Sequence, residues 1–302
     1  MKKNNSNNIG ISLIIHTKNE EKNIKDCILS AKRIVNEILV IDMSSSDKTA
    51  DIAKRMGALV FVISDSDFVD NCRNFGFSKA RFNWILSLDA DERLTVSLAD
   101  QLLRIITENS YDVVMIPFKN IRFGKWMRHT GFWPDYHPRF FKKGYVKFPK
   151  NIKQPHVPQK ISGRVLTLGA DECNAIVHYN VENLSHMLAK FTRYVEVKGG
   201  GDFFEKNKIN PQVLINYYEN EFRWRYIDQQ GYLDGMAGFV SSKFREFFKF
   251  TEFVKWWEKQ GYTDIVDEKE LQKIVLKEYR LKGDKSMYQK IKLFVNNLFQ
   301  AF

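Results

Sequence analysis

The sequence contains little cysteine and no long apolar run. Its three cysteines, Cys27, Cys72 and Cys173, have no CxxC spacing, which argues against a disulfide scaffold and a zinc ribbon and favours a reducing compartment. No 18 consecutive residues are apolar, and the chain begins with the polar stretch MKKNNSNN, where a signal peptide needs an apolar segment. We therefore expect a soluble, cytoplasmic protein.

Glycine-rich phosphate-binding motifs are missing as well. The chain contains neither GxGxxG nor GxxxxGKS/T, so neither a Rossmann dinucleotide site nor a P-loop is indicated. Its 302 residues are 44% hydrophobic and 27% charged. This balance is typical of a globular protein with a sizeable core and argues against a disordered or fibrous chain.

Acidic residues are scarce in one segment. Between residues 119 and 164, twelve lysines and arginines stand against a single acid, Asp135, and this segment alone accounts for the net charge of +11 of the whole chain. Such a segment attracts an anionic partner, which can be the phosphates of a small molecule, a lipid surface or nucleic acid. A merely solubilising basic surface explains the composition equally well.

The first 118 residues alternate between strand-like and helix-like patterns. Short apolar runs predict strands at 11–16, 38–42, 59–63, 84–89 and 113–118, and apolar residues at helical spacing predict helices at 19–34, 47–56, 68–80 and 98–108. This alternation is typical of a mostly parallel sheet with helices on its faces. The sequence therefore predicts an α/β fold.

The pattern changes after Pro117. Six of the seven prolines lie between residues 117 and 158, which predicts loops and short strands. Helical patterns follow at 183–198, 211–230, 236–258, 264–281 and 286–301. We divide the chain into an α/β half (1–118), loops and short strands of the same domain (119–181) and a helical C-terminal region (182–302).

Residues 238–257 are unusually aromatic, with phenylalanines and tryptophans interleaved with basic residues. Core packing of a helical subdomain explains this pattern. A helix lying in a membrane interface explains it too, and together with residues 287–302 it would hold the protein reversibly on an anionic membrane.

Polar residues follow three of the predicted strands. The first strand runs into the sequence TKNE (17–20), the second ends at Asp42 before SSSD (44–47), and the fourth ends in DADE (89–92). Ligands of a parallel sheet bind beyond the carboxyl ends of its strands. We therefore expect these residues to form one site.

The pair Asp89 and Asp91 is a candidate metal site. Paired carboxylates at a fixed sheet edge suit Mg²⁺ or Mn²⁺, which complete their coordination with substrate phosphates. The spacing alone is weak, because Asp65 and Asp67 repeat it in an ordinary-looking loop. The strand before Asp89 is what distinguishes the two pairs.

These stretches resemble family-2 glycosyltransferases of the GT-A fold, most of all the bacterial branch that contains lipopolysaccharide-core glucosyltransferases. The motifs are ISLIIHTKNEEKNIKDCILSAKRIVNEILVIDMSSSDKTADIAKRMGALVF and CRNFGFSKARFNWILSLDADERLT, with weaker likeness in WPDYHPRFFKK (133–143), VHYN (177–180) and GYLDGMAGF (231–239). The resemblance implies a GT-A-type, mostly parallel sheet and a nucleoside-diphosphate sugar donor. It also implies UDP as the nucleotide and inversion at the anomeric carbon.

The resemblance assigns roles to matching positions. The donor-binding residues it implies are Thr17, Asn19, Glu20, Asp42, Arg73, Asn74 and Asp89, and Asp91 is the ligand of Mn²⁺ or Mg²⁺. The chain departs from the family pattern in two places. The usual glycine of the Asp-x-Gly-Ser-x-Asp motif is Ser44 or Ser45, and the His-Glu of the acceptor half is His156-Val157.

The acceptor half contains two candidates for the catalytic base. Asp135 is the one acid in the basic segment, and His156 is the reserve candidate. We expect Arg139, Lys142 and Lys143 on the acceptor side, facing an anionic glycan or glycolipid.

Some polar and sulfur-containing residues are interpreted as structural. His16 and His178 are taken as packing or hydrogen-bonded residues, and Cys72 as a small apolar filler.

We predict a metal-dependent glycosyltransferase that acts on a cell-surface glycolipid or glycan precursor and has no nucleic-acid partner. Two other functions stay open. A nucleic-acid-binding protein would use segment 119–164 but leaves the strand-end carboxylates unexplained. A degenerate transferase kept as an assembly partner is disfavoured by the intact Asp89 and Asp91.

Overall fold

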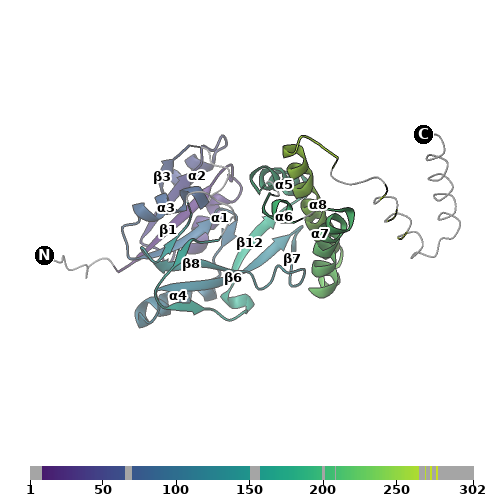
Figure 1. Cartoon of the computed structure of the whole chain (residues 1–302). Helices are drawn as coiled ribbons and strands as arrows, with labels where there is room; N and C mark the ends of the chain where they lie inside the picture. The colour runs from purple at the N-terminus through teal and green to yellow at the C-terminus, as the bar shows by residue number, and fades with distance from the viewer. Residues whose placement is uncertain are drawn as a thin grey trace, which may run out of the picture. The chain divides into compact units, whose positions relative to one another are not determined.

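The computed structural model of the chain consists of two compact units (Figure 1). One comprises residues 1–190 and 229–239, and the other residues 191–228 and 240–302. The structure describes residues 9–64, 70–149, 157–198, 201–207 and 209–264, with the single residues 269, 273 and 277. The strand ends singled out by the sequence all belong to the first unit.

A ten-stranded sheet forms the centre of the first unit, and its main path has the order β3-β2-β1-β4-β8-β6-β12-β5. The strands are β1 (Ile11–Thr17), β2 (Glu37–Asp42), β3 (Leu59–Val62), β4 (Trp84–Asp89), β5 (Glu92–Arg93), β6 (Val113–Arg122), β8 (Tyr136–Lys142) and β12 (Ile176–Val181). Strands β1 to β4 are parallel, β8 pairs antiparallel with β4 and β6, and β12 is parallel to β6. The predicted α/β fold with a mostly parallel sheet is confirmed.

The carboxyl ends of three strands lie side by side. Strand β1 lies between β2 and β4, with Thr17 aligned with Asp42 and His16 aligned with Asp89. Across the sheet the strand order runs from β3 back to β1 and then continues with β4. Where the strand order reverses in this way, a crevice opens beyond the carboxyl ends of the strands. The fold thus brings the predicted donor-binding residues to one edge.

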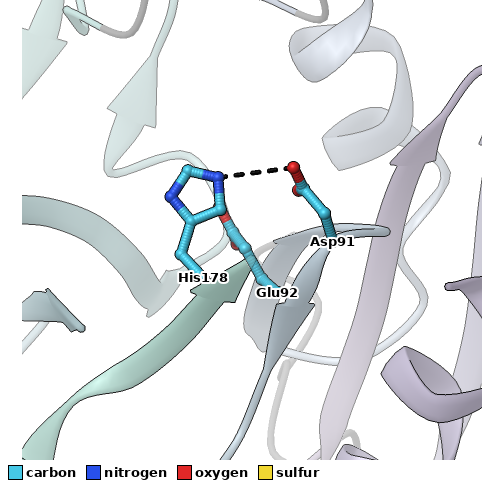
Figure 2. A group of neighbouring side chains, drawn as sticks. All are labelled: Asp91, Glu92 and His178. Atoms are coloured by element: carbon cyan, nitrogen blue, oxygen red, sulfur yellow. Dashed lines mark ion pairs between the residues drawn. The ribbon is translucent and has the colours of Figure 1, made fainter. Parts of the chain in front are cut away.

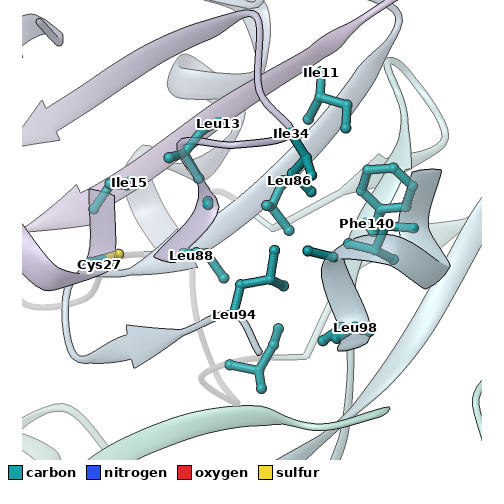
Figure 3. Packing of buried hydrophobic residues seen from close by; sticks show 14 of the residues in the cluster. Ile11, Leu13, Ile15, Cys27, Ile34, Leu86, Leu88, Leu94, Leu98 and Phe140 are labelled. Atoms are coloured by element: carbon teal, nitrogen blue, oxygen red, sulfur yellow. The ribbon is translucent and has the colours of Figure 1, made fainter. Parts of the chain in front are cut away.

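Helices cover both faces of the sheet. Helices α1 (Ile24–Ala31), α2 (Thr49–Arg55) and α4 (Val96–Glu108) pack on one face, and α3 (Asp70–Lys79) packs on the other. Successive strand residues point to opposite faces, so Leu13 and Leu86 pack with α1 and α4 (Figure 3), whereas Ile14 and Ile85 pack with α3. Because Asp89 lies an even number of residues from Ile85, it points to the α3 face.

Helix α1 begins later than the predicted helix 19–34. Asn19 has a left-handed backbone, with φ of 53°, which is not compatible with a helix. The backbone N–H groups of Asn19 and Glu20 donate to Ser45 Oγ and Thr49 Oγ1 at 2.9 and 2.8 Å. These contacts keep residues 19–23 as a loop at the site.

Residues 119–181 contribute more to the sheet than the sequence predicted. The expected short strands are present as β7 (Lys125–Trp126), β9 (Val146–Lys147), β10 (Lys160–Ile161) and β11 (Val165–Thr167), with a 3₁₀ turn at Glu172–Asn174. In addition, β8 and β12 enter the central sheet. Pro138 is tolerated inside β8 because the pairing with β6 shifts register between Val114 and Met115.

The C-terminal region is helical, as predicted. It contains α5 (Leu184–Lys198), α6 (Gly201–Lys206), α7 (Pro211–Arg223), a π turn (Trp224–Asp228), a 3₁₀ turn (Gly231–Asp234) and α8 (Gly235–Lys259). The predicted helices at 264–281 and 286–301 lie almost wholly outside the described residues.

Part of the aromatic face of α8 packs in the core of the second unit. Phe248 and Trp256 are buried, and the ring of Phe204 lies 5.7 Å from that of Phe253 and 5.5 Å from that of Trp256. This supports the core-packing interpretation of segment 238–257. Among the helices that the structure describes, none has the length and apolar character needed to cross a bilayer.

Candidate active site

Asp89 ends β4 between two buried arginines. Its carboxylate accepts hydrogen bonds from Arg139 Nη2 at 2.8 Å and from Arg73 Nη2 at 2.9 and 3.0 Å. Burial alone would raise the pKa of Asp89, but the two guanidinium groups outweigh it and hold the pKa well below its usual value. Asp89 is therefore ionised at neutral pH and held in one orientation.

Arg73 reaches the end of β4 because α3 lies very close to the sheet. A Cβ added to Gly76 would be 2.8 Å from Ile14 Cγ2 and 3.0 Å from Ile41 Cγ1. Only glycine permits this approach without displacing side chains of β1 and β2. The guanidinium of Arg73, one turn earlier in the helix, is thereby brought to the sheet surface.

Asn74 holds a neighbouring segment in place. Its Nδ2 donates to the carbonyl of Phe148 at 2.8 Å, and the N–H of Phe148 donates back to Oδ1 at 3.0 Å. The ring of Phe148 lies 5.3 Å from the Arg73 guanidinium, a cation–π distance. The predicted Arg-Asn pair thus connects Asp89 to the segment that follows β9.

Glu92 is completely buried beside Asp89. Its Oε2 accepts from the backbone N–H of Asp89 at 3.0 Å, and its Oε1 accepts from Arg139 Nη2 at 2.5 Å. Burial raises the pKa of Glu92, and the charges of Asp89 and Asp91 raise it further, so it stays well above its usual value despite Arg139. Glu92 fixes the turn that carries both aspartates.

Asp91 contacts two basic side chains that the sequence interpretation left out of the site. His178 Nε2 and Lys190 Nζ lie 3.4 and 3.3 Å from the same oxygen, Oδ2. Figure 2 shows the imidazole on β12 facing Asp91, with Glu92 beside it. Burial would raise the pKa of Asp91, but Lys190 and then His178 hold it well below its usual value.

Asn120 of β6 determines how His178 is oriented. The Asn120 amide nitrogen donates to the carbonyl of Phe132 at 3.1 Å and lies 3.4 Å from Asp135 Oδ2. Its Oδ1 therefore faces His178 Nδ1, 2.7 Å away, and must accept a hydrogen bond from it. With its proton on Nδ1, a neutral His178 presents the lone pair of Nε2 toward Asp91.

Glu20 adds a fourth acid to this group. Burial raises the pKa of Glu20, and the charge of Asp91 raises it further, to about 7. Its Oε2 accepts from Asn23 Nδ2 at 2.8 Å. The loop between β1 and α1 thus places a carboxyl group that changes charge near neutral pH close to Asp91.

The donor set fits a divalent metal ion. One oxygen each of Asp91 and Glu92 and one nitrogen of His178 lie within 4.8 Å of one another. In its neutral form, His178 has a lone pair on the nitrogen that faces Asp91. Imidazole suits Mn²⁺ better than Mg²⁺, which prefers oxygen ligands and water. The residues present are therefore suited to such an ion.

The ends of β1 and β2 form a connected polar loop. Thr17 and Asp42 are buried, and Asp42 Oδ1 accepts from the Ser45 backbone N–H at 3.0 Å and from its hydroxyl at 2.5 Å. Asn19 Oδ1 accepts from the N–H of Ser46 at 2.8 Å. The serine-rich stretch that replaces the family's usual glycine thus links the two predicted donor-binding loops.

Asp135 lies just before β8 with its side chain about half exposed. Its Oδ1 is 3.1 Å from His137 Nε2. Burial acts to raise the pKa of Asp135, but the hydrogen bond and charge of His137 outweigh it and lower the pKa. Through Asn120, Asp135 is connected to His178. The other candidate base, His156, lies outside the described residues.

The three predicted acceptor-side cations do not lie together. Arg139 is buried at the Asp89 edge. Lys142 pairs with the first residue of β4 at the opposite end of that strand, and its Nζ donates to Asp112 at 2.8 Å. Lys143 Nζ donates to the carbonyl of Ala80 at 2.6 Å, just beyond α3. The antiparallel direction of β8 separates them.

A hollow borders the buried arginines. It is small and open to solvent, and it is lined by Arg73, His137, Pro138, Arg139 and Phe148. Two cations and an aromatic ring at one opening suit an anionic or aromatic group of a ligand.

Comparison with known proteins identifies the family. Residues 12–164, about half of the chain, match the model of glycosyl transferase family 2. The chain belongs to this family. An uncharacterized glycosyltransferase of Rickettsia bellii is 26% identical over 261 residues, which cover 81% of this chain and 85% of the relative. Another from Rickettsia prowazekii is 39% identical over 102 residues, 34% of this chain and 35% of the relative.

Among solved structures, residues 1–349 of Staphylococcus aureus TarS superpose on 84% of this chain and 92% of that chain, with 15% identity and a TM-score of 0.45. Family membership agrees with the predicted enzyme class, and the protein is a glycosyltransferase. It favours this function over nucleic-acid binding, which the basic segment had left open.

Proposed function

We propose that this family-2 glycosyltransferase transfers a sugar from a nucleoside-diphosphate sugar, with UDP as the nucleotide, to an acceptor hydroxyl with inversion and with the help of a divalent metal ion. The observation that supports this most strongly is the grouping of Asp91, Glu92 and His178 at the strand ends beside Asp89. A strand end with a purely structural role does not require three side chains of the kinds that bind metal ions, drawn from two distant parts of the chain.

Asp91 and His178 are proposed as the ligands of Mn²⁺ or Mg²⁺, with Glu92 beside them. The ion, when bound, offsets negative charge on the departing diphosphate as a Lewis acid. Asn120 supports this role, because it keeps the proton of a neutral His178 on Nδ1 and leaves Nε2 free to bind.

The donor is proposed to bind along the edge formed by β1, β2 and β4. Thr17, Asn19 and Asp42 would contact the nucleoside, and Glu20 would line the site close to Asp91. Asp89 would contact the ribose or the sugar while Arg73 and Arg139 keep it ionised. The adjoining hollow supports this arrangement, since Arg73 and Phe148 line it.

Asp135 is proposed as the base that accepts the proton of the attacking hydroxyl. Its carboxylate is partly exposed and paired with His137. The lowered pKa of Asp135 keeps it ionised at neutral pH, at the expense of basicity. Asn120 contacts both Asp135 and His178, so the base and the metal ligand are held by one amide. His156 stays the reserve candidate.

An anionic acceptor is proposed, such as a phosphorylated glycolipid of the kind implied by the lipopolysaccharide-core resemblance. Lys119 precedes Asn120 on β6, and Arg128 follows β7, with both side chains directed at Glu172.

The enzyme is proposed to work in the cytoplasm, in peripheral contact with an anionic membrane. Phe247 and Phe250 on α8 keep 49% and 40% of their surface exposed, which leaves an apolar strip among basic residues. The second predicted contact, residues 287–302, lies outside the described part of the chain.

The test is donor hydrolysis by the full chain with a panel of UDP-sugars and Mn²⁺. Many transferases slowly transfer the sugar to water when no acceptor is present, and we expect release of UDP with one sugar and its loss on adding EDTA. No binding or hydrolysis of any sugar nucleotide would contradict the proposal. Tight, salt-steep binding to nonspecific RNA or DNA would support the nucleic-acid alternative.

A further inference from the structure

Lys190 contacts the carboxylate oxygen of Asp91 that faces His178. Its Nζ lies 3.3 Å from Asp91 Oδ2, the same oxygen that His178 Nε2 approaches to 3.4 Å. Nζ also donates to the carbonyl of Asn180 at 2.7 Å. The ammonium is therefore held at two points against the proposed metal ligand.

This arrangement accounts for the charge of the site without a metal. Asp91 is buried, and an ionised carboxylate in such a position needs a positive partner. Lys190 supplies it. A divalent ion bound by Asp91 would stand close to the same ammonium, and like charges at short range repel strongly where little water screens them.

We propose that Lys190 is a built-in competitor of the metal ion: it neutralises Asp91 in the metal-free enzyme and must leave that oxygen when the ion binds. This inference rests on the proposed function of Asp91 as a metal ligand. The carbonyl of Asn180 keeps Nζ beside β12 after its release from Asp91. The displaced ammonium is then placed to pair with the negative charges that the diphosphate brings into the site.

A competitor role and a merely structural salt bridge predict opposite effects of removing Lys190 on metal affinity. If Lys190 only fastened α5 to the turn at Asp91, its removal would loosen the protein and leave metal affinity unchanged or weakened. A competitor has the opposite effect, because its removal makes metal binding tighter.

The experiment is a titration of the full chain with Mn²⁺, without nucleotide, that measures free Mn²⁺ by electron paramagnetic resonance. Lys190→Met removes the charge and keeps an unbranched side chain, and Lys190→Arg keeps the charge. Arg193→Met is the matched control, because it removes one positive charge from an exposed position on the same helix. We expect Lys190→Met to bind Mn²⁺ roughly tenfold more tightly than the wild type, and the other two variants to change the affinity by about twofold or less.

Two results would overturn parts of the account separately. Unchanged or weaker Mn²⁺ binding by a folded Lys190→Met, with a wild type that binds Mn²⁺, contradicts the competitor role alone. Absence of Mn²⁺ binding by the wild type and by Lys190→Met, with and without UDP, contradicts the metal site of the proposed function. Should Lys190→Met fail to fold, Lys190→Gln serves the same comparison.

Discussion

Oδ1 of Asn120 lies 2.7 Å from Nδ1 of His178, and this contact decides which ring nitrogen faces Asp91. The amide nitrogen of Asn120 is already committed to the Phe132 carbonyl and to Asp135. The oxygen is thus left to accept the Nδ1 proton. Through this amide, the strand pair β6–β12 connects the proposed base to the proposed metal ligand.

Asn120→Ala is expected to weaken Mn²⁺ binding. Loss of a hydrogen bond that orients a metal-binding histidine typically reduces affinity by about 10–100-fold. Calorimetric titration with Mn²⁺ measures the change. Asn120→Asp, which keeps an oxygen facing His178 Nδ1, should retain most of the affinity. Wild-type Mn²⁺ binding by Asn120→Ala would contradict the orienting role.

Glu20→Gln is expected to change how stability depends on pH. Burial and Asp91 raise the pKa of Glu20 from 4.5 to about 7 in the folded protein. An acid with a raised folded pKa lowers the free energy of unfolding as pH rises from its unfolded to its folded value. The wild type should therefore lose, relative to Glu20→Gln, about 3 kcal/mol between pH 4.5 and pH 8.

Urea unfolding of both proteins in metal-free buffer across this range measures the difference. Parallel stability curves for the two proteins would show that Glu20 titrates near its ordinary value.

Arg139→Met is expected to destabilise the fold severely. It removes one of the two cations that pair with Asp89 and the cation that pairs with Glu92, and it leaves the buried Glu92 without that partner. The expected loss is about 3–5 kcal/mol in free energy of unfolding. Arg33→Met breaks a half-exposed pair with Asp100 and should cost about 1 kcal/mol or less. Denaturant unfolding measures both variants. Equal losses in the free energy of unfolding for Arg139→Met and Arg33→Met would contradict the buried role of Arg139.

Gly238→Ala should disrupt the corner that contains GYLDGMAG. An added Cβ would lie 1.9 Å from the carbonyl oxygen of Gly231, which has to move. Asp234 in this corner accepts hydrogen bonds from the backbone of Arg128 and His129. We expect the free energy of unfolding, measured by thermal unfolding, to fall by about 2 kcal/mol or more.

Gly169→Ala is the matched control for this substitution. The nearest atom to its added Cβ is 3.8 Å away, so its stability should stay within about 0.5 kcal/mol of the wild type. A tolerated Gly238→Ala would show that the corner relaxes without cost.

The sequence predicted those parts of the site that follow local patterns. Asp42 and Asp89 end apolar strands, and parallel pairing with β1 brings such ends together. The α/β fold and the early helical C-terminal elements were predictable for the same reason, because hydrophobic periodicity acts over a few residues.

The remaining site residues depend on contacts between distant parts of the chain. Asn120 and His178 meet because β12 pairs with β6, and nothing in VHYN alone indicates this neighbour. Arg139 was expected with Lys142 and Lys143, but the insertion of β8 between β4 and β6 buries it. A strand placed by pairing across fifty residues leaves no local signal for which of its residues face the site.

The most direct test of the account is the response of Asp91→Asn to Mn²⁺. The substitution keeps the shape of the side chain and removes the charge that would hold the ion against the diphosphate. We expect Mn²⁺-dependent UDP binding to be lost and turnover to fall by roughly a hundredfold or more, which corresponds to about 3 kcal/mol. Asp135→Asn should lose turnover and keep Mn²⁺-dependent UDP binding. A wild-type Mn²⁺ response in folded Asp91→Asn would show that this turn is a structural strand end and would contradict the metal-dependent mechanism.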